Sequence, residues 1–413
     1  MPKGGAAVAR TLEVAAGEVV LNATDATSKL QVGATFELSG GTLVLNVPAE
    51  VDGAAFIRSG ATLTHSIMGD TRNKVTAWNR VDLTVNGDLT VEQGGEINTV
   101  RKGYNKNIGE SQRARVHGAR LSTLNSLPSV SAPTNGVWAA YGSIFHPVTG
   151  GESYDNWSGQ PGGGVIRLQV AGTLTVDGTV TSGGYYSVGG SGTAGGSVWI
   201  TAGALAGAGL ITAEGGKRDY AGGSAGTGGR VAIYLTTAAG TNAYTGAVTA
   251  KGGSYGTAGS LPERPCGTVY WQFADEDDYA GTIVLDNAKG GPSNNAFTDE
   301  DGKKWTRAAI GATDIPAGEA GDDPKLFKNV KVVLRNYARA FFTTDLQIRD
   351  IVVEDKSDVF VNGHDVEVLT LDHKRRKGWS KDAFVFNPER SNEIPPKLGR
   401  LHWRLPGLLI FVK

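Results

Sequence analysis

The chain lacks several features that mark common classes of protein. It contains one cysteine, Cys266, in 413 residues, which excludes an intramolecular disulfide framework and a cysteine-built zinc site. Lysine and arginine number 40 against 41 aspartates and glutamates, so overall charge gives no reason to expect a nucleic-acid partner. No apolar run approaches the roughly 20 residues of a membrane helix, so we expect no transmembrane segment. Residues 1–10 also lack the apolar core of a secretory signal.

Glycine is the residue that the chain has in excess. It supplies 60 of 413 residues, about twice the usual frequency of roughly 7 %, and it occurs in pairs between short apolar strands. One glycine-bracketed unit is repeated over residues 161–193, 194–227 and 228–260, and a degenerate fourth copy begins at Cys266. The first apolar strand residues of the copies are Val165, Val198, Val231 and Val269. A period of about 33 residues predicts a solenoid of stacked copies.

Apolar and polar residues also alternate outside the repeat, which predicts many short strands. The pair Asn86-Gly87 fits either a type I′ hairpin or a corner between two strands of a stack, and the repeat favours the corner. The predicted organisation has five parts: N-terminal coils over 1–100, an irregular basic and aromatic insertion over 101–160, the glycine-rich repeat over 161–291, a charged insertion over 292–328, and C-terminal coils with a cap over 329–413.

Stacking accounts for the repeat physically. A strand such as VIRLQV (165–170) exposes unpaired backbone groups and one apolar face, and the next copy, about 4.8 Å away, satisfies both. Glycine pairs permit the tight corners between strands. We therefore predict an all-β fold, a single-stranded right-handed parallel β-helix with glycine-rich loops and irregular insertions. Its handedness follows the general rule for parallel crossovers.

The strings GGGVIRLQVAGTLTVDGTVTSGG (162–184), GGSVWITAGALAGAGLITAEGG (195–216) and VNGHDVEVL (361–369) resemble the glycine-rich right-handed parallel β-helix repeats of bacterial surface proteins. Those proteins are adhesin-like or autotransporter-passenger-like. The resemblance covers roughly residues 11–100 and 160–370, and residues 101–125 and those after Lys374 depart from it. It implies an extracellular or cell-surface protein with a structural or adhesive role.

The alternative function is a carbohydrate-active enzyme, either a polysaccharide lyase or a glycoside hydrolase, because pectate-lyase-like enzymes share that fold. Such enzymes need converging carboxylates, with calcium in the lyases. The acidic candidates include Asp275, Asp277 and Asp278, which form a candidate calcium site or a solvated loop, whereas the tripeptide at 363–365 lacks the partners of a hydrolase motif. The sequence therefore favours a non-enzymatic role, with no cofactor except this candidate calcium.

Three tyrosines recur after the glycine pairs. Tyr185, Tyr220 and Tyr255 are spaced 35 residues apart, so successive copies would present them along one edge. Exposed aromatic rings stack on the apolar faces of sugars and lose little entropy when ordered. The alternative is that they pack on the loop bases, as we expect the strand residues Trp199 and Trp271 to do within the fold. We therefore predict weak binding of a polysaccharide or cell-surface glycan at Tyr185, Tyr220 and Tyr255.

Two basic stretches, 101–120 and 374–377, could contact an anionic polysaccharide or nucleic acid. No nucleic-acid module accompanies them, so a solvated loop or a charged cover for the end of the stack is favoured. An uncovered end of a parallel stack is a template for further pairing. End-to-end self-association is therefore a further expectation.

Overall fold

A computed structural model describes most of the chain. The described residues are 6–23, 27–69, 79–104, 117–119, 140–153, 160–186, 191–218, 225–254, 264–288, 296–298, 304–306, 312–317, 321–354, 357–361, 364–370, 384–386 and 400–403. They are almost entirely β-strand and connecting segments. The helical segments among the described residues are two short 3₁₀ turns, η1 (Ala239–Thr241) and η3 (Pro324–Asn329).

The strands form two principal sheets. The large sheet contains β1 (Ala6–Val14), β3 (Lys29–Leu38), β5 (Ala49–Val51), β6 (Ala55–Ile57), β8 (Val81–Val85), β9 (Leu89–Val91), β11 (Val165–Val176), β13 (Ser197–Gly207), β15 (Arg230–Leu235), β16 (Ala243–Tyr244), β18 (Thr268–Gln272), β19 (Thr282–Asp286), β23 (Lys331–Arg335) and β26 (Asp350–Val353). The seven-stranded sheet contains β2 (Glu18–Asn22), β4 (Gly41–Asn46), β7 (Ala61–Thr64), β10 (Glu96–Asn98), β12 (Thr179–Thr181), β14 (Leu210–Thr212) and β17 (Ala247–Thr249).

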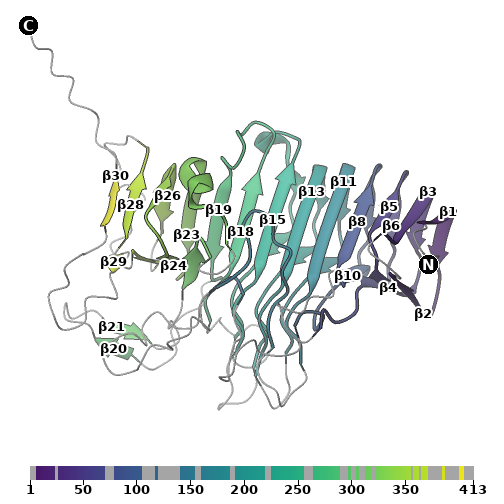
Figure 1. Ribbon diagram of the computed structural model, residues 1–413, viewed down its shortest axis with the longest axis horizontal. Helices are drawn as coiled ribbons and strands as arrows, with labels where there is room; N and C mark the ends of the chain where they lie inside the picture. The colour runs from purple at the N-terminus through teal and green to yellow at the C-terminus, as the bar shows by residue number, and fades with distance from the viewer. Residues whose placement is uncertain are drawn as a thin grey trace, which may run out of the picture.

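Three smaller sheets complete the described fold. A four-stranded sheet contains β22 (Thr313–Ile315), β24 (Arg339–Phe342), β27 (Asp358–Phe360) and β29 (Phe384–Phe386), a three-stranded sheet contains β25 (Leu346–Ile348), β28 (Asp365–Val368) and β30 (Arg400–Trp403), and a hairpin contains β20 (Ala296–Thr298) and β21 (Lys304–Thr306). The strands lie side by side along one long axis, with β1–β3 at one end and β28–β30 at the other (Figure 1).

The all-β prediction is confirmed, but the prediction of a single-stranded right-handed parallel β-helix is wrong. The pairings close a ring of six parallel strands, β3, β5, β8, β11, β9 and β6, and the other parallel sheets lie outside this ring. The ring forms because β3 and β11 are long, so each pairs with two short strands on one side. In addition, β18 and β19 pair antiparallel. The spacing of apolar residues reveals neither the paired length of a strand nor a reversal of the chain.

The repeat copies do stack in parallel, although one position is out of register. Ile166, not Val165, pairs with Val198, which pairs with Val231 and through it with Val269. Val165 belongs to a separate buried cluster with Met68, Tyr104 and Tyr141. Because neighbouring residues of a strand point to opposite faces, this shift of one residue places Ile166, and not Val165, in the main core. The spacing of the copies is 32, 33 and 38 residues.

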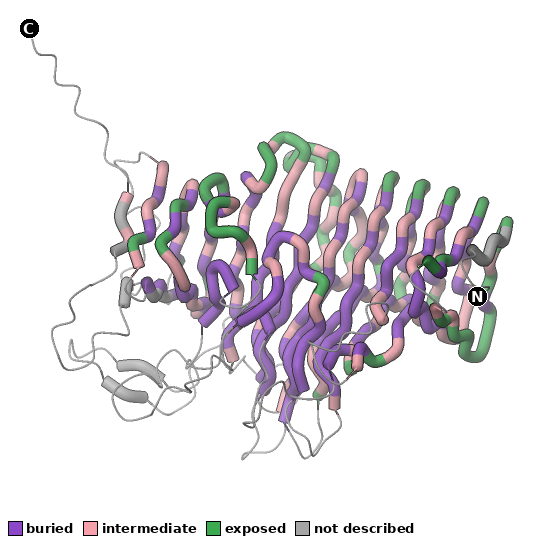
Figure 2. Tube along the Cα trace, in the orientation of Figure 1, coloured by how far each residue is buried: buried purple, intermediate pink, exposed green. Residues whose placement is uncertain are grey.

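The main core lies between the large and the seven-stranded sheets. Apolar side chains from both sheets, such as Leu168 and Val180, are fully buried there, and each contributes about 1.5–3 kcal/mol by leaving water. In Figure 2 the buried segments run through the strands and the exposed segments lie at the turns. A second core around Phe145, Phe327 and Phe342 continues toward the C-terminal strands.

The pair Asn86-Gly87 lies at a bend and not in a hairpin. The strands on either side, β8 and β9, are not paired with each other, because both pair in parallel with β11. A register irregularity in β11 between Val170 and Thr173 lies opposite the same bend. The hairpin alternative is therefore wrong, and these two residues connect β8 to β9 at a corner, as the repeat favoured.

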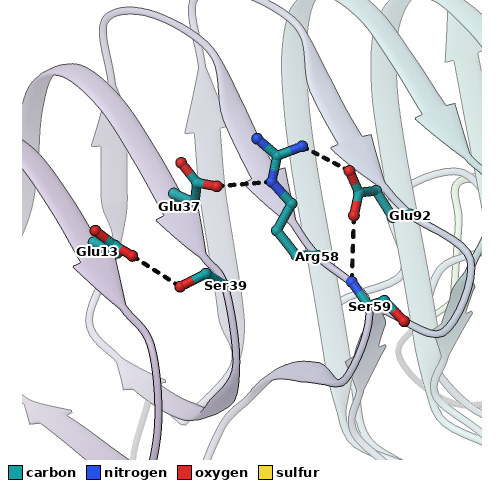
Figure 3. A network of polar contacts seen from close by, with 6 residues as sticks. All are labelled: Glu13, Glu37, Ser39, Arg58, Ser59 and Glu92. Carbon is teal, nitrogen blue, oxygen red and sulfur yellow. Dashed lines mark hydrogen bonds and ion pairs between the residues drawn. The ribbon is translucent and has the colours of Figure 1, made fainter.

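Ion pairs join successive strands at the surface of the large sheet. Arg58, which follows β6, donates from Nε to Glu37 Oε1 at 2.8 Å and from Nη1 to Glu92 Oε1 at 2.6 Å (Figure 3). The hydrogen bonds with Glu92 and Glu37 raise the pKa of Arg58, and the bond from Arg58 lowers the pKa of Glu92. This network tethers three neighbouring levels of the stack.

Candidate functional site: a groove along the seven-stranded sheet

A row of side-chain oxygens follows the outward face of the seven-stranded sheet. Thr181, Thr212 and Thr249 pair with one another on β12, β14 and β17, and Asn98 precedes them on β10. Val180 and Ile211, each one residue before a threonine, point into the core, so strand alternation turns the threonines to the opposite face. Thr181 and Thr212 are largely buried there, with 9 % and 6 % of their surface exposed. We call Thr181, Thr212 and Thr249 the threonine ladder.

Each ladder residue also shapes the turn that follows it. The threonine Oγ1 accepts a hydrogen bond from the backbone N–H two residues later, at 3.2 Å from Gly183, 3.2 Å from Glu214 and 3.3 Å from Lys251. Asn98 Oδ1 makes the same bond at 3.0 Å to the N–H of Val100. These short local bonds end each strand in the same way, so the residues after them, Val100, Gly183, Glu214 and Lys251, occupy corresponding positions.

Two hollows lie along this sheet, one on the ladder face and one at the edge of its last strand. The first, of about 510 Å³, is lined by Val100, Thr181, Gly183, Gly184, Tyr186, Leu210, Thr212, Glu214, Gly215, Gly216 and Lys217. The second, of about 680 Å³, is lined by Leu210, Glu214, Gly246, Ala247, Val248, Thr249, Ala250, Lys251, Gly267, Val269, Trp271, Val284, Asp286, Ala288 and Arg335. Leu210 and Glu214 line both hollows, so we treat the two as one groove.

The second hollow lies where the seven-stranded sheet ends. β17 is the last strand of that sheet within the described chain, whereas the large sheet continues through β18, β19 and β23. Trp271 and Val284 therefore lie beyond the last strand of the smaller sheet and form an apolar wall. Trp271 is half-buried and stacks on Phe273 with ring centroids 6.0 Å apart and planes 4° apart. The wall is an extended aromatic surface.

Charged side chains in the groove are mostly paired. Lys251 Nζ lies 3.1 Å from Glu214 Oε1, and Arg335 Nε lies 2.6 Å from Asp286 Oδ2. Asp286 Oδ1 accepts further hydrogen bonds from the Asn336 side chain at 2.9 Å and the Ala288 N–H at 2.7 Å. Both carboxylates are thus held in fixed orientations. Both oxygens of Asp286 and the Oε1 atom of Glu214 have protein partners.

The predicted tyrosines have different outcomes. Tyr185 lies at the margin of the groove, where the Arg101 guanidinium carbon is 4.3 Å from the centre of its ring. Its neighbour Tyr186, which the sequence analysis did not single out, lines the first hollow with 37 % of its surface exposed. Tyr220 and Tyr255 lie outside the described residues, so the predicted row of three remains a prediction.

The candidate calcium ligands lie in the exposed turn between β18 and β19. Asp275, Asp277 and Asp278 are exposed, and Asp275 Oδ1 accepts a hydrogen bond from the Ala239 N–H at 3.2 Å. Within the described ranges, no group of three or more histidine, cysteine, aspartate or glutamate side chains is placed to hold a metal ion. The structure does not assemble these three carboxylates into a site, and calcium binding there stays a prediction.

A second aromatic cluster lies on the outward face of the large sheet, but it is covered. Residues 140–149, which we call the strap, place His146 against Trp199 and Tyr234, with ring centroids 5.0 and 6.1 Å away. Tyr234 donates its hydroxyl to the Phe145 carbonyl at 2.8 Å, and its burial raises its pKa above the ordinary value. Burial likewise lowers the pKa of His146. This cluster packs within the fold, as predicted for Trp199.

Acidic residues far along the chain anchor the strap. The Ala140 N–H donates to Asp314 Oδ2 at 3.1 Å, and the Ile144 N–H donates to Asp322 Oδ2 at 2.7 Å. Arg230 is fully buried beneath the strap and donates from Nε to the Tyr141 carbonyl at 3.1 Å. Burial lowers the pKa of Arg230 to about 10, although the charges of Asp322 and Asp314 act in the opposite direction. These bonds close one face of the stack.

No protein-family model matches the chain, and neither a curated protein nor a solved structure is significantly similar to it. No helix in the described part is long and apolar enough to cross a membrane.

Proposed function

We propose that this protein is an extracellular or cell-surface structural and adhesive protein that binds a glycan in the groove. The observation that carries the proposal is the composition of the groove. Tyr186 lines its first hollow and Trp271 its second, and the polar threonine ladder runs along its floor. Aromatic faces stack on sugar rings, while hydroxyl and backbone groups form hydrogen bonds with sugar hydroxyls.

The shape of the groove supports a linear ligand. The ladder residues lie on consecutive parallel strands, which are about 4.8 Å apart, and the two hollows share a wall at Leu210 and Glu214. A chain of sugars can therefore contact several levels of the stack at once. Many weak contacts along one polymer give useful avidity, which suits an adhesive role.

The enzyme alternative has less support. Glu214 and Asp286 do lie in the same hollow with Lys251 and Arg335, which is a combination that polysaccharide cleavage would need. Each carboxylate, however, has a basic partner at 3.1 or 2.6 Å. A glycosidase requires one carboxyl group to give its proton to the leaving oxygen, and an ion pair with a basic side chain favours the ionised carboxylate, which has no proton to give.

Binding and cleavage are separated by one experiment. The protein would be applied to an array of neutral and acidic polysaccharides, and the same polymers would be assayed for new reducing ends and unsaturated products, with and without calcium. We expect binding without products, and Tyr186→Ala and Trp271→Ala should weaken it about tenfold each, because stacking contributes about 0.5–1.5 kcal/mol beyond buried area.

Phe56 provides a matched control. The guanidinium carbon of Arg58 lies 4.2 Å from the centre of the Phe56 ring. This pair lies outside the groove and has the same arrangement as Arg101 and Tyr185. Phe56→Ala should leave binding unchanged. Equal losses for Phe56→Ala and Tyr186→Ala would reject the groove as the binding site, and release of products from any polymer would replace the adhesive proposal with the enzymatic one.

A further inference from the structure

The first hollow exists because one corresponding position lacks a side chain. The residues two places after Asn98 and the ladder threonines are Val100, Gly183, Glu214 and Lys251. Val100 carries a branched apolar side chain, and Glu214 and Lys251 carry long charged ones. Gly183 alone carries none. The floor of the hollow is therefore backbone and the Thr181 hydroxyl, flanked by Val100 on one side and Glu214 on the other.

The charges around this gap are not balanced. The groove is lined by three basic side chains, Lys217, Lys251 and Arg335, and two carboxylates, Glu214 and Asp286, which leaves a net charge of +1. Both carboxylates are used by Lys251 and Arg335. Among the described residues no ion pair to Lys217 is formed, and this lysine lines the first hollow. The exposed Arg101 adds a second cation beside Val100.

We propose that the first hollow is a subsite for a negatively charged sugar, so that the glycan bound in the groove is an acidic polysaccharide bearing carboxylates. This inference rests on the proposed glycan binding and specifies its ligand. The sugar ring lies over Gly183 against Tyr186, and its carboxylate pairs with Lys217. Glu214 does not repel it strongly, because Lys251 neutralises the Glu214 charge.

A side chain substituted at Gly183 can fill the first hollow. A β carbon built at Gly183 would lie 3.4 Å from Thr181 Oγ1, 3.6 Å from the Glu214 carbonyl oxygen and 3.8 Å from a Val100 methyl, all ordinary contacts. Its φ angle is not in the left-handed region. A larger side chain at this position therefore extends into the hollow without distorting the backbone, and it competes with the sugar for the same space.

The test uses two probes with the same backbone and different charge, polygalacturonate and its fully methyl-esterified form, with the full-length protein. We expect the acid form to bind at least fivefold more tightly at low salt and to lose this advantage in 1 M salt, where the screening length falls to about 3 Å. Lys217→Gln should reduce the affinity for the acid form about three- to fivefold, the scale of an exposed ion pair. It should leave the affinity for the ester unchanged.

Three further variants test the gap at Gly183 and provide a control. Gly183→Leu should abolish binding of the acid form in the first hollow, and Gly183→Ala, which is smaller, serves if the leucine variant fails to fold. Lys328→Gln removes an exposed lysine outside the groove and should change nothing. Thermal melts of each variant confirm that the fold is intact.

The outcomes separate this inference from the proposed function. Equal binding of acid and ester, both lost in Gly183→Leu, would overturn the acidic subsite and keep the glycan groove. Preference for the acid that survives Lys217→Gln would also overturn the subsite as assigned. Absence of binding to every polysaccharide would reject the groove and the subsite together.

Discussion

The two outward faces of this molecule are built from the same repeats, but only one of them is covered by another segment of the chain. On the large sheet the strap covers Trp199, Tyr234 and Tyr270, and the strap's Phe145 and Ile144 are fully buried with them. On the seven-stranded sheet the face stays open and short polar side chains line it. A repeat therefore dictates how strands stack, whereas segments outside the repeat decide which face remains available to a ligand.

The largest expected effect comes from breaking the covered face at its buried cation. Arg230→Met leaves the Tyr141 carbonyl and the Thr268 hydroxyl without their donors at 3.1 and 3.2 Å and removes the buried positive charge that lies near Asp322 and Asp314. Removing one member of such a buried set costs about 3–5 kcal/mol. Urea denaturation would measure the loss, and Arg230→Lys should recover part of it. A loss below 1 kcal/mol would show that the strap does not depend on Arg230.

A pair of glycine substitutions compares the packed stack with the open groove. A β carbon at Gly228 would overlap the Ala250 carbonyl oxygen, a backbone atom that cannot give way, whereas one at Gly183 meets only ordinary contacts. We expect Gly228→Ala to lower the free energy of unfolding by about 3 kcal/mol and Gly183→Ala to change it by less than about 1 kcal/mol. Thermal melts of the two variants suffice, and similar values would remove the distinction between the two environments.

Acid should destabilise the junction between the two sheets through His65. Its Nε2 accepts the Val165 N–H at 3.1 Å, and Nδ1 donates to the Ser66 carbonyl at 2.6 Å, so both nitrogens are used by the neutral ring. Burial above all, together with the charge of Lys102, lowers the pKa of His65 from 6.5 to about 3.

As the pH falls below 6.5 the unfolded chain binds a proton at this histidine and the folded chain does not. Stability contributed by His65 is therefore present above pH 6.5 and is lost progressively down to about pH 3. Between pH 6.5 and 5 the loss is on the order of 2 kcal/mol. Denaturation at several pH values would measure it, and His65→Gln should flatten the dependence in this range. An unchanged slope in that variant would place the titrating group elsewhere.

The smallest effect is expected at the exposed network around Arg58. Its side chain and that of Glu92 are 34 % and 37 % exposed, and exposed ion pairs contribute about 0–1 kcal/mol. Arg58→Met should therefore cost less than about 1 kcal/mol, and the difference from the parent protein should shrink in high salt. A cost that is larger and independent of salt would show that the network is as important as the buried contacts of the covered face.

Part of this fold was predictable from the sequence. The spacing of the glycine pairs gave the stacking of β11, β13, β15 and β18, with one residue of error because Val165 and Ile166 are both apolar and both buried, in different clusters. The closed ring of six strands was not predictable, since apolar alternation reveals where a strand lies but not how far its pairing extends. The reversal at β18 and β19 was also missed, because both strands carry the same pattern in either direction.

The candidate site was predicted only at its margin. Tyr185 was singled out and lies beside the groove, but the ladder was missed, although its signal is visible in the strings VTSGG (180–184), ITAEGG (211–216) and VTAKGG (248–253). Each carries a threonine shortly before a glycine pair, two residues before it in the first string and three residues before it in the other two. Trp271 was assigned to the fold alone, because no sequence pattern indicates that the seven-stranded sheet ends at β17 while the large sheet continues through β18, β19, β23 and β26.

The anchoring of the strap also dictates an order of events during synthesis. Residues 140–144 are held by hydrogen bonds to Asp314 and Asp322, which leave the ribosome more than 160 residues later. The aromatic face of β13 and β15 is therefore synthesised before the residues that anchor the strap over it. β15 ends at Leu235, about 80 residues before Asp314, and at the usual rate of about 5–20 residues per second their synthesis takes on the order of 4–16 seconds. During that time the nascent chain presents an uncovered aromatic surface, and it is then that a chaperone or a neighbouring chain can compete for it.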